Sequence, residues 1–84
     1  MPVICRFYGI LIKMYFRAGE HNPPHFHAIY GDRSGMFDLD TLDMIEGDLP
    51  QKALAMVQEW GKDHRAELLE IWNTQKFREI APLE

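Results

Sequence analysis

The chain has 84 residues and a formal net charge of −4 at pH 7, and 46% of its residues are hydrophobic and 26% charged. This composition is that of a folded globular domain, and it excludes a disordered tail and a protein that binds duplex nucleic acid through dense Lys/Arg patches. The longest apolar stretch, residues 8–16, is too short to span a membrane, and no signal peptide is recognisable. We therefore expect one cytoplasmic domain over residues 1–84, for which a homo-oligomeric interface would supplement a small core.

Two short segments near the N-terminus have the composition of β-strands. Residues 3–7 and 10–17 are rich in β-branched and aromatic side chains and are separated by Tyr8-Gly9, which is typical of a hairpin. The single cysteine, Cys5, lies in the first segment. We expect it to be a small buried hydrophobe without redox chemistry.

Three of the four histidines stand in the segment from His21 to His27, which reads His-Asn-Pro-Pro-His-Phe-His. The two prolines restrict the backbone between His21 and His25, so this corner has few conformations to lose on folding. Residues 25–30 then have the pattern of a strand, and its period of two places His25 and His27 on one face. The sequence therefore predicts a pair of imidazoles that point the same way.

Two further strands are predicted after the histidine segment. Residues 31–35 form a glycine-rich turn cluster, and residues 36–40 alternate apolar and polar side chains as an antiparallel partner strand does. A short strand around residues 42–45 completes the sheet. Because the strands come first and a helical pattern last, we expect an α+β domain with an antiparallel sheet of four to five strands.

The C-terminal half carries the pattern of a helix. Residues 46–50 contain an acidic capping residue and a proline that is tolerated in the first helical turn. Apolar residues then recur at spacings of three and four, which predicts one long helix packed on the sheet, with Gly61 as the candidate position of a kink. His64 lies on this apolar stripe, which would carry it toward the sheet. The last residues are expected to fray after Ala81-Pro82.

One interpretation of the histidines is a metal site. His25 and His27, on one strand face, can both reach a single ion at about 2.0–2.1 Å, with His21 or His64 as a third nitrogen ligand. Such a set leaves an open coordination position, as catalytic zinc sites do. A divalent metal such as zinc is therefore the candidate cofactor, although no cysteine pair and no helical His-Glu-x-x-His motif accompanies the histidines.

A second interpretation keeps the site free of metal. Two of the clustered imidazoles act as general acid and base, and a nearby cation stabilises the phosphorane that forms when RNA is cleaved at a 2′-hydroxyl. The candidate acid–base residues are His21, His25 and His27, and the candidate cations are Arg6, Lys13, Arg17 and Arg33.

A third interpretation is structural. The histidines and Asn22 would hydrogen-bond the backbone around the diproline corner and hold this loop against the sheet. The chain would then be a non-enzymatic interaction module that binds a partner through an exposed sheet edge or through its acidic helix. The sequence leaves the choice between an enzyme and such a module open.

The chain also resembles a known family over nearly its whole length. The resemblance rests on the opening Met1–Ile10, the His21–His27 segment with Tyr30-Gly31, the Glu46–Pro50 turn and the segment Trp60–Trp72. The family is a short bacterial domain of unknown function, number four-one-six-zero. Its members look like components of two-gene modules of toxin–antitoxin type. The resemblance implies a small protein partner encoded beside this chain, and it makes RNA a candidate target.

Overall fold

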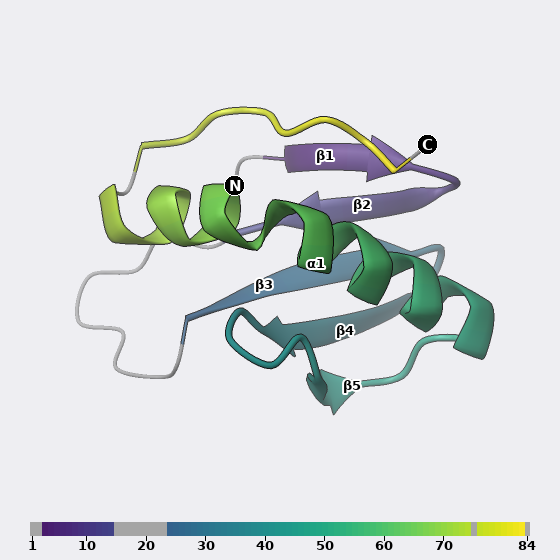
Figure 1. Cartoon of the computed structure of the whole chain (residues 1–84). Coiled ribbons are helices and arrows are strands. Elements are labelled where there is room, and N and C mark those ends of the chain that lie inside the picture. The colour runs from purple at the N-terminus through teal and green to yellow at the C-terminus, as the bar shows by residue number, and fades with distance from the viewer. Residues whose placement is uncertain (1–2, 15–23, 75, 84) are drawn as a thin grey trace.

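The protein has two layers in a computed structural model that describes residues 3–14, 24–74 and 76–83 (Figure 1). Within these residues, five antiparallel strands form one sheet in the order β1-β2-β3-β4-β5, and one helix, α1, crosses a face of it. The elements are β1 (Val3–Phe7), β2 (Ile10–Lys13), β3 (His25–Tyr30), β4 (Arg33–Asp38), β5 (Met44–Gly47) and α1 (Gln51–Thr74). The predicted α+β fold, with four to five strands followed by a long helix, is confirmed. In the part of the chain that is described, no helix has the length and apolar character that crossing a bilayer demands.

Two tight turns set the register of the hairpins. β1 and β2 are joined by Tyr8-Gly9, whose φ angles of +46° and +81° suit the twist of the two strands. Gly31-Asp32 joins β3 to β4 so closely that Tyr30 pairs with Arg33. β4 therefore begins at Arg33 rather than at the predicted Met36, because most of the expected turn cluster is strand.

The last strand is displaced along the chain from its predicted place. The sequence pattern favours residues 42–45, whereas β5 covers Met44–Gly47. The reason is a turn after β4. In this turn, Asp38 Oδ1 accepts hydrogen bonds from the backbone N–H groups of Asp40 and Thr41 at 2.7 and 3.2 Å. Leu42 follows this turn with a φ of +64°, and its side chain is buried in the core instead of continuing a strand.

One apolar core lies between α1 and the sheet. Trp60 of α1 is fully buried, and its ring centroid lies 5.6 Å from that of Phe7 and 6.0 Å from that of Phe26. Phe26 also stacks on Phe37 with ring centroids 5.3 Å apart. Large apolar side chains contribute about 1.5–3 kcal/mol each when fully buried, so this cluster is the main source of stability. Cys5 belongs to it, as predicted.

The kink in α1 is at His64 and not at the predicted Gly61. His64 has φ −120° and ψ 18°, which lie outside the helical range. Gly61 serves close packing instead, because a Cβ atom at this position would lie 2.9 Å from Cδ2 of Leu42 and 3.7 Å from Cζ of Phe26. The missing side chain thus lets α1 approach the sheet.

The C-terminal tail, residues 76–83, runs along β1 (Figure 1). The backbone N–H of Ile80 donates a hydrogen bond to the carbonyl oxygen of Ile4 at 3.0 Å. The indole N–H of Trp60 donates a hydrogen bond to the carbonyl oxygen of Ala81 at 2.8 Å. The side chain of Ile80 is buried, and Leu83 packs against the core. The expected fraying after Ala81-Pro82 is therefore wrong for Leu83, which packs against the core, and Glu84 lies outside the described residues.

The contribution of the tail to the core can be measured with a pair of variants. Ile80→Ala is expected to lower the free energy of unfolding by about 2–5 kcal/mol, since it empties a buried position. Phe77→Ala removes a ring that is 45% exposed at a neighbouring tail position, and it should change this free energy by about 0.5 kcal/mol or less. Urea denaturation followed by tryptophan fluorescence measures both, and equally small effects would show that the tail lies outside the core.

Candidate functional site

The face of the sheet opposite α1, called the far face below, carries the clustered histidines of β3. Alternation along β3 puts Phe26 and Ala28 in the core under the helix and directs His25 and His27 to the far face, although the ring of His25, at the first position of the strand, also contacts Trp72 of α1. Their ring centroids are 5.4 Å apart, and the ring planes are inclined by 77°. The two imidazoles therefore lie next to each other, as the period of the strand predicts.

His27 lies within a polar row that crosses four strands of the far face. Its register neighbours are Lys13 on β2 and Met36 on β4, and Met36 is paired in turn with Glu46 on β5. Directly opposed residues of antiparallel strands hold their Cβ atoms about 4.5–5.5 Å apart. His27, Met36 and Glu46 also line a shallow hollow together with Ser34. A cation, an imidazole and a carboxylate are thus brought into one line.

The surroundings of His27 disfavour its charged form. Burial lowers the pKa of His27 below its ordinary value of 6.5, the neighbouring His25 lowers it further, and the Glu46 carboxylate acts in the opposite direction. Because the lowering effects dominate, the imidazole is neutral at neutral pH. A neutral imidazole is the form that accepts a proton or ligates a metal ion.

His25 is held more deeply than its neighbour. His25 is 6% exposed, and its ring centroid lies 5.1 Å from the ring centroid of Trp72 near the end of α1. Its register partner on β4 is Asp38, whose carboxylate holds the turn that follows this strand. His27 is therefore the more accessible imidazole of the pair.

His64 lies on a different surface. Its Nδ1 atom donates a hydrogen bond to Oε1 of Glu67 at 2.7 Å, and its ring centroid lies 5.4 Å from that of Trp60. It lines a groove between α1 and tail residues 81–83. The helical stripe thus places His64 beside the tail, in contact with Glu67 and Trp60.

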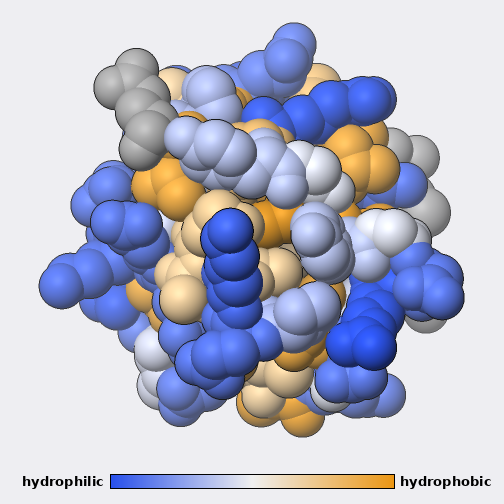
Figure 2. Space-filling view, turned by 90° about the vertical axis from the view of Figure 1, so that its right-hand side faces the viewer, coloured by the Kyte–Doolittle hydropathy of each residue, from blue (hydrophilic) through white to orange (hydrophobic). Residues whose placement is uncertain are grey.

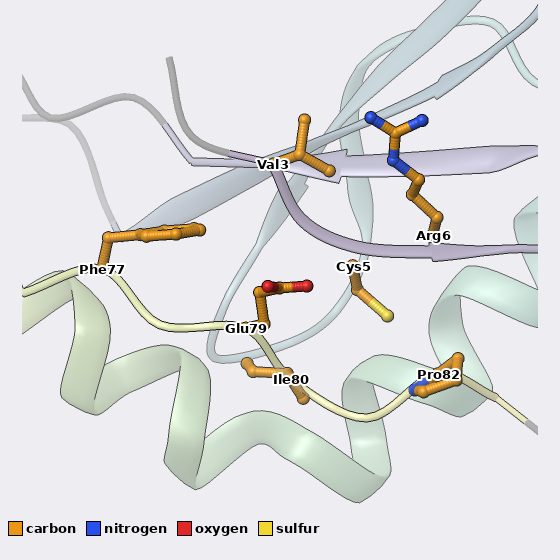
Figure 3. Close-up of a pocket in the computed structure, with 7 residues that line it drawn as sticks. All are labelled: Val3, Cys5, Arg6, Phe77, Glu79, Ile80 and Pro82. Atoms are coloured by element: carbon orange, nitrogen blue, oxygen red, sulfur yellow. The ribbon is translucent and has the colours of Figure 1, made fainter.

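Arg6, one of the candidate cations, stands at a hollow between β1 and the tail (Figure 3). Phe77 and Glu79 reach from the tail toward β1, whereas the guanidinium of Arg6 points away from the tail. Burial raises the pKa of the Cys5 thiol in the same hollow, which makes this group a poor nucleophile. Because β2 lies between Arg6 and β3, Lys13 is the candidate cation that stands in register with His27.

The metal interpretation finds two ligands on the far face. In residues 3–14, 24–74 and 76–83, no group of three or more His, Cys, Asp or Glu side chains is arranged to hold an ion. Catalytic zinc sites have about three protein ligands, and His25 and His27 alone do not make such a set. The candidate third ligand His21 and the candidate cation Arg17 lie outside the described residues. Arg33 is exposed beside the β3–β4 turn.

Sequence reasoning missed the pairing of Lys13 with His27. Among the four candidate cations the sequence favours Arg6 and gives no reason to single out Lys13, because the connection from β2 to β3 leaves the register between these strands undetermined. Alternation gives a partial signal, since Lys13 and His27 are polar residues in strands whose other face is apolar. That signal identifies the shared face, and only the structure identifies the neighbour.

The lowered pKa of His27 makes folding stability depend on pH. Above about pH 6.5 the imidazole is neutral in the folded and the unfolded chain, so it contributes nothing. As the pH falls, the unfolded chain binds the proton first, and stability is lost until the pH reaches the lower pKa of the folded state. When the pH is lowered from about 7 to about 5, the melting temperature of His27→Gln should therefore fall less than that of the parent protein.

Thermal melts across this range test the expectation, with Ser34→Ala as the control that should keep the pH slope of the parent. An NMR titration of the His27 ring measures the pKa directly. A value at or above that of a free histidine, about 6.5, would contradict the assignment.

The comparison with known proteins identifies the family. No curated protein and no solved structure matches the chain. The profile of the family described as Domain of unknown function (DUF4160) matches residues 9–73. This span runs from the β1–β2 turn to the last turn of α1 and includes both strand histidines and the polar row. The chain therefore belongs to the DUF4160 family, a domain of unknown function.

Proposed function

We propose that the chain cleaves a phosphate ester of RNA or a nucleotide, with the histidine pair of the far face as its acid–base centre. The observation that carries this proposal is the place of His27, a neutral imidazole that has His25 beside it and Lys13 in register on the next strand. Cleavage of RNA at a 2′-hydroxyl needs a base, an acid and a cation for the charged phosphorane. The far face carries a residue of each kind.

Each of the three residues takes one role in this reaction. His27 accepts the proton of the attacking 2′-hydroxyl, since it is neutral at neutral pH and half-buried. The 2′-oxygen then bonds to phosphorus and the bond to the 5′-oxygen breaks, and His25 donates a proton to that leaving oxygen. Ring centroids 5.4 Å apart allow one phosphate group to contact both imidazoles. The ammonium of Lys13 stabilises the negative charge that develops on the phosphate oxygens.

The charge of the far face favours a small, single-stranded target. Lys13 and Arg6 are balanced there by Asp38 and Glu46, and the whole chain carries a net charge of −4. Duplex binding draws its affinity from many phosphate contacts, which this surface does not provide. Flexible single strands can instead place one phosphate at the histidine pair.

The chain resembles a family whose members look like components of bacterial two-gene modules, and this resemblance supports a role for the activity within such a module. We propose that the chain works in the cytoplasm beside a small neighbour-encoded protein that binds it. In such a module, an activity against RNA would be harmful unless the partner controls it.

The proposal is tested with untagged protein, a short single-stranded RNA and the DNA strand of the same sequence. The RNA should be cut to fragments ending in a 2′,3′-cyclic phosphate, and the DNA should stay intact because it has no 2′-hydroxyl. His27→Gln should lower the rate about 10²–10⁴-fold, because general base catalysis contributes that much. Lys13→Gln should lower it about 10²-fold through lost charge stabilisation.

The control Ser34→Ala removes a neighbouring hydroxyl of the hollow and should leave the rate unchanged. A chelator should also leave the rate unchanged, and loss of activity on chelation would favour the metal interpretation. Intact RNA, or cleavage that survives His27→Gln, would refute the proposed centre.

A second candidate function is protein binding at the β5 edge of the sheet. The other edge strand, β1, is covered by the tail through the bond from Ile80 to Ile4. Among the described residues β5 pairs with β4 alone, and its Ile45 is 49% exposed. A free edge with an exposed apolar side chain accepts an extended segment of another protein through backbone hydrogen bonds.

The acidic side of α1 is the weaker of the two predicted interfaces. Glu67 bonds to His64, and Oε2 of Glu67 and Oε1 of Glu70 each lie 3.8 Å from Nη2 of Arg78 in the tail. The tail thus neutralises part of the charge that a basic partner would need.

Variants on the two surfaces separate these interfaces. If the neighbour-encoded protein adds a strand to β5, Ile45→Lys should weaken the complex at least about tenfold, which is about 1.4 kcal/mol of binding free energy. Charge reversal on the helix by Glu59→Lys should then have little effect, and so should His27→Gln. Isothermal titration of the purified pair gives the affinities. The reverse pattern would assign the interface to α1.

A further inference from the structure

Two exposed tyrosines stand together at the end of the sheet opposite to His25. Tyr8 and Tyr30 are 61% and 38% exposed, and each immediately precedes the glycine of a hairpin turn. Both hairpins turn at the same end of the sheet, where α1 also begins (Figure 1). A groove of about 290 Å³ opens there, lined by Tyr8, Tyr30, Pro50, Lys52, Ala53 and Met56. It is called the tyrosine groove below.

Figure 2 shows this end of the molecule. Pale orange, apolar surface lies near the centre of the view on both sides of a hydrophilic side chain, and further hydrophilic side chains surround it. Phe7, the neighbour of Tyr8, is buried against Trp60, so the core at this end is already filled by other rings. Exposed apolar surface that is gathered at one hollow and rimmed by polar groups marks a binding site more often than scattered exposure does.

Each tyrosine ring has a neighbour in the folded chain, and the ring of Tyr8 lies edge-on to that of Phe7 with ring centroids 6.4 Å apart. Tyr8 has a φ of +46°, in a turn where glycine or asparagine is better suited, so the ring does not serve the turn itself. Tyr30 lies against Gly9, where an added Cβ atom would be 3.5 Å from Cε1 of its ring. Rings that already have such neighbours lose less freedom when they contact a flat ligand.

We propose that the tyrosine groove binds a nucleotide, whose base stacks on the tyrosine rings and whose phosphate meets Lys52. Nucleobases stack readily on exposed aromatic rings. Met56 and Ala53 supply apolar contact beneath the base. Among the described residues that line the groove, Lys52 is the only charged one, and its ammonium is complementary to a phosphate. The volume of the groove is close to the lower bound of small-ligand pockets, about 300 Å³, which matches one nucleotide.

This groove is separate from the acid–base centre of the far face. Tyr30 and His27 are three positions apart on β3, which is about 10 Å along a strand, and their side chains point to opposite faces. The inference therefore does not rest on the proposed cleavage of RNA. A proline-rich peptide also suits an aromatic groove, but it brings no charge to match Lys52.

The test uses three ligands: adenosine 5′-monophosphate, adenosine without the phosphate, and ribose 5-phosphate without the base. Titration into the untagged protein, followed by amide NMR shifts, should give saturable binding of adenosine 5′-monophosphate with the largest shifts around Tyr8, Tyr30 and Lys52. Adenosine and ribose 5-phosphate should each bind at least about tenfold more weakly, because each lacks one of the two contacts.

Variants assign the contacts. Lys52→Met should reduce the affinity for adenosine 5′-monophosphate to that for adenosine, while Lys62→Met, a change of an exposed lysine on the same helix outside the groove, should leave it unchanged. Tyr8→Asn removes the ring in a turn that asparagine tolerates, and it should weaken the nucleotide and adenosine alike. His27→Gln should leave the nucleotide-induced shifts around Tyr8, Tyr30 and Lys52 unchanged.

Four results would overturn the inference. They are the absence of saturable nucleotide binding, binding that survives Tyr8→Asn, binding at the groove that is lost in His27→Gln, and binding of a proline-rich peptide to the groove in place of the nucleotide. The RNA cleavage rate of His27→Gln tests the proposed cleavage, and the nucleotide affinity of Tyr8→Asn tests the groove. The failure of one proposal is therefore distinguished from the failure of the other.

Discussion

The burial of Trp60 is the constraint on which the rest of the structure depends. Its fully buried ring contacts Phe7 of β1 and Phe26 of β3, so it joins the helix to both halves of the sheet. An indole N–H in apolar surroundings is costly unless it finds an acceptor, and Ala81 in the tail supplies one. The same tail then covers the edge of β1 through Ile80. One side chain thus fixes the position of the helix and, through its hydrogen bond, that of the tail.

Because the helix covers only one face of the sheet, the residues of the core and the polar residues of the candidate site lie on different faces. On β3 the residues that alternate toward α1, Phe26 and Ala28, are fully buried, whereas His25 and His27 face away. Changes in the polar row of the far face therefore leave the apolar contacts of Trp60 in place. The pKa of His27 is lowered by burial first and by the neighbouring His25 second, on the face of β3 that the main core does not use.

The sequence predicts this fold as far as local patterns reach. Hairpin turns, strand alternation and helical spacing are properties of neighbouring residues, so they gave the element types and the shared face of the two histidines. The shifted bounds of β4 and β5 follow from local turns, whereas the other failures involve partners that are distant in sequence. Gly61 is a packing position and not a kink because Leu42 approaches it from another element. The tail is held by the hydrogen bond from Trp60 to Ala81, which lies 21 residues away. Lys13 lies beside His27 because of the register between β2 and β3, which the sequence of β2 alone does not determine.

The two candidate sites share β3, and this strand limits how they can influence each other. From His27 to Tyr30 it is paired with β2 on one side and with β4 on the other. A ligand at either site could shift this segment only by breaking hydrogen bonds in two ladders at once. His25 pairs with Asp38 of β4 and lies against Trp72 of α1. Because the segment between the two sites is paired on both sides, we expect a nucleotide in the tyrosine groove to leave the geometry around His27 unchanged.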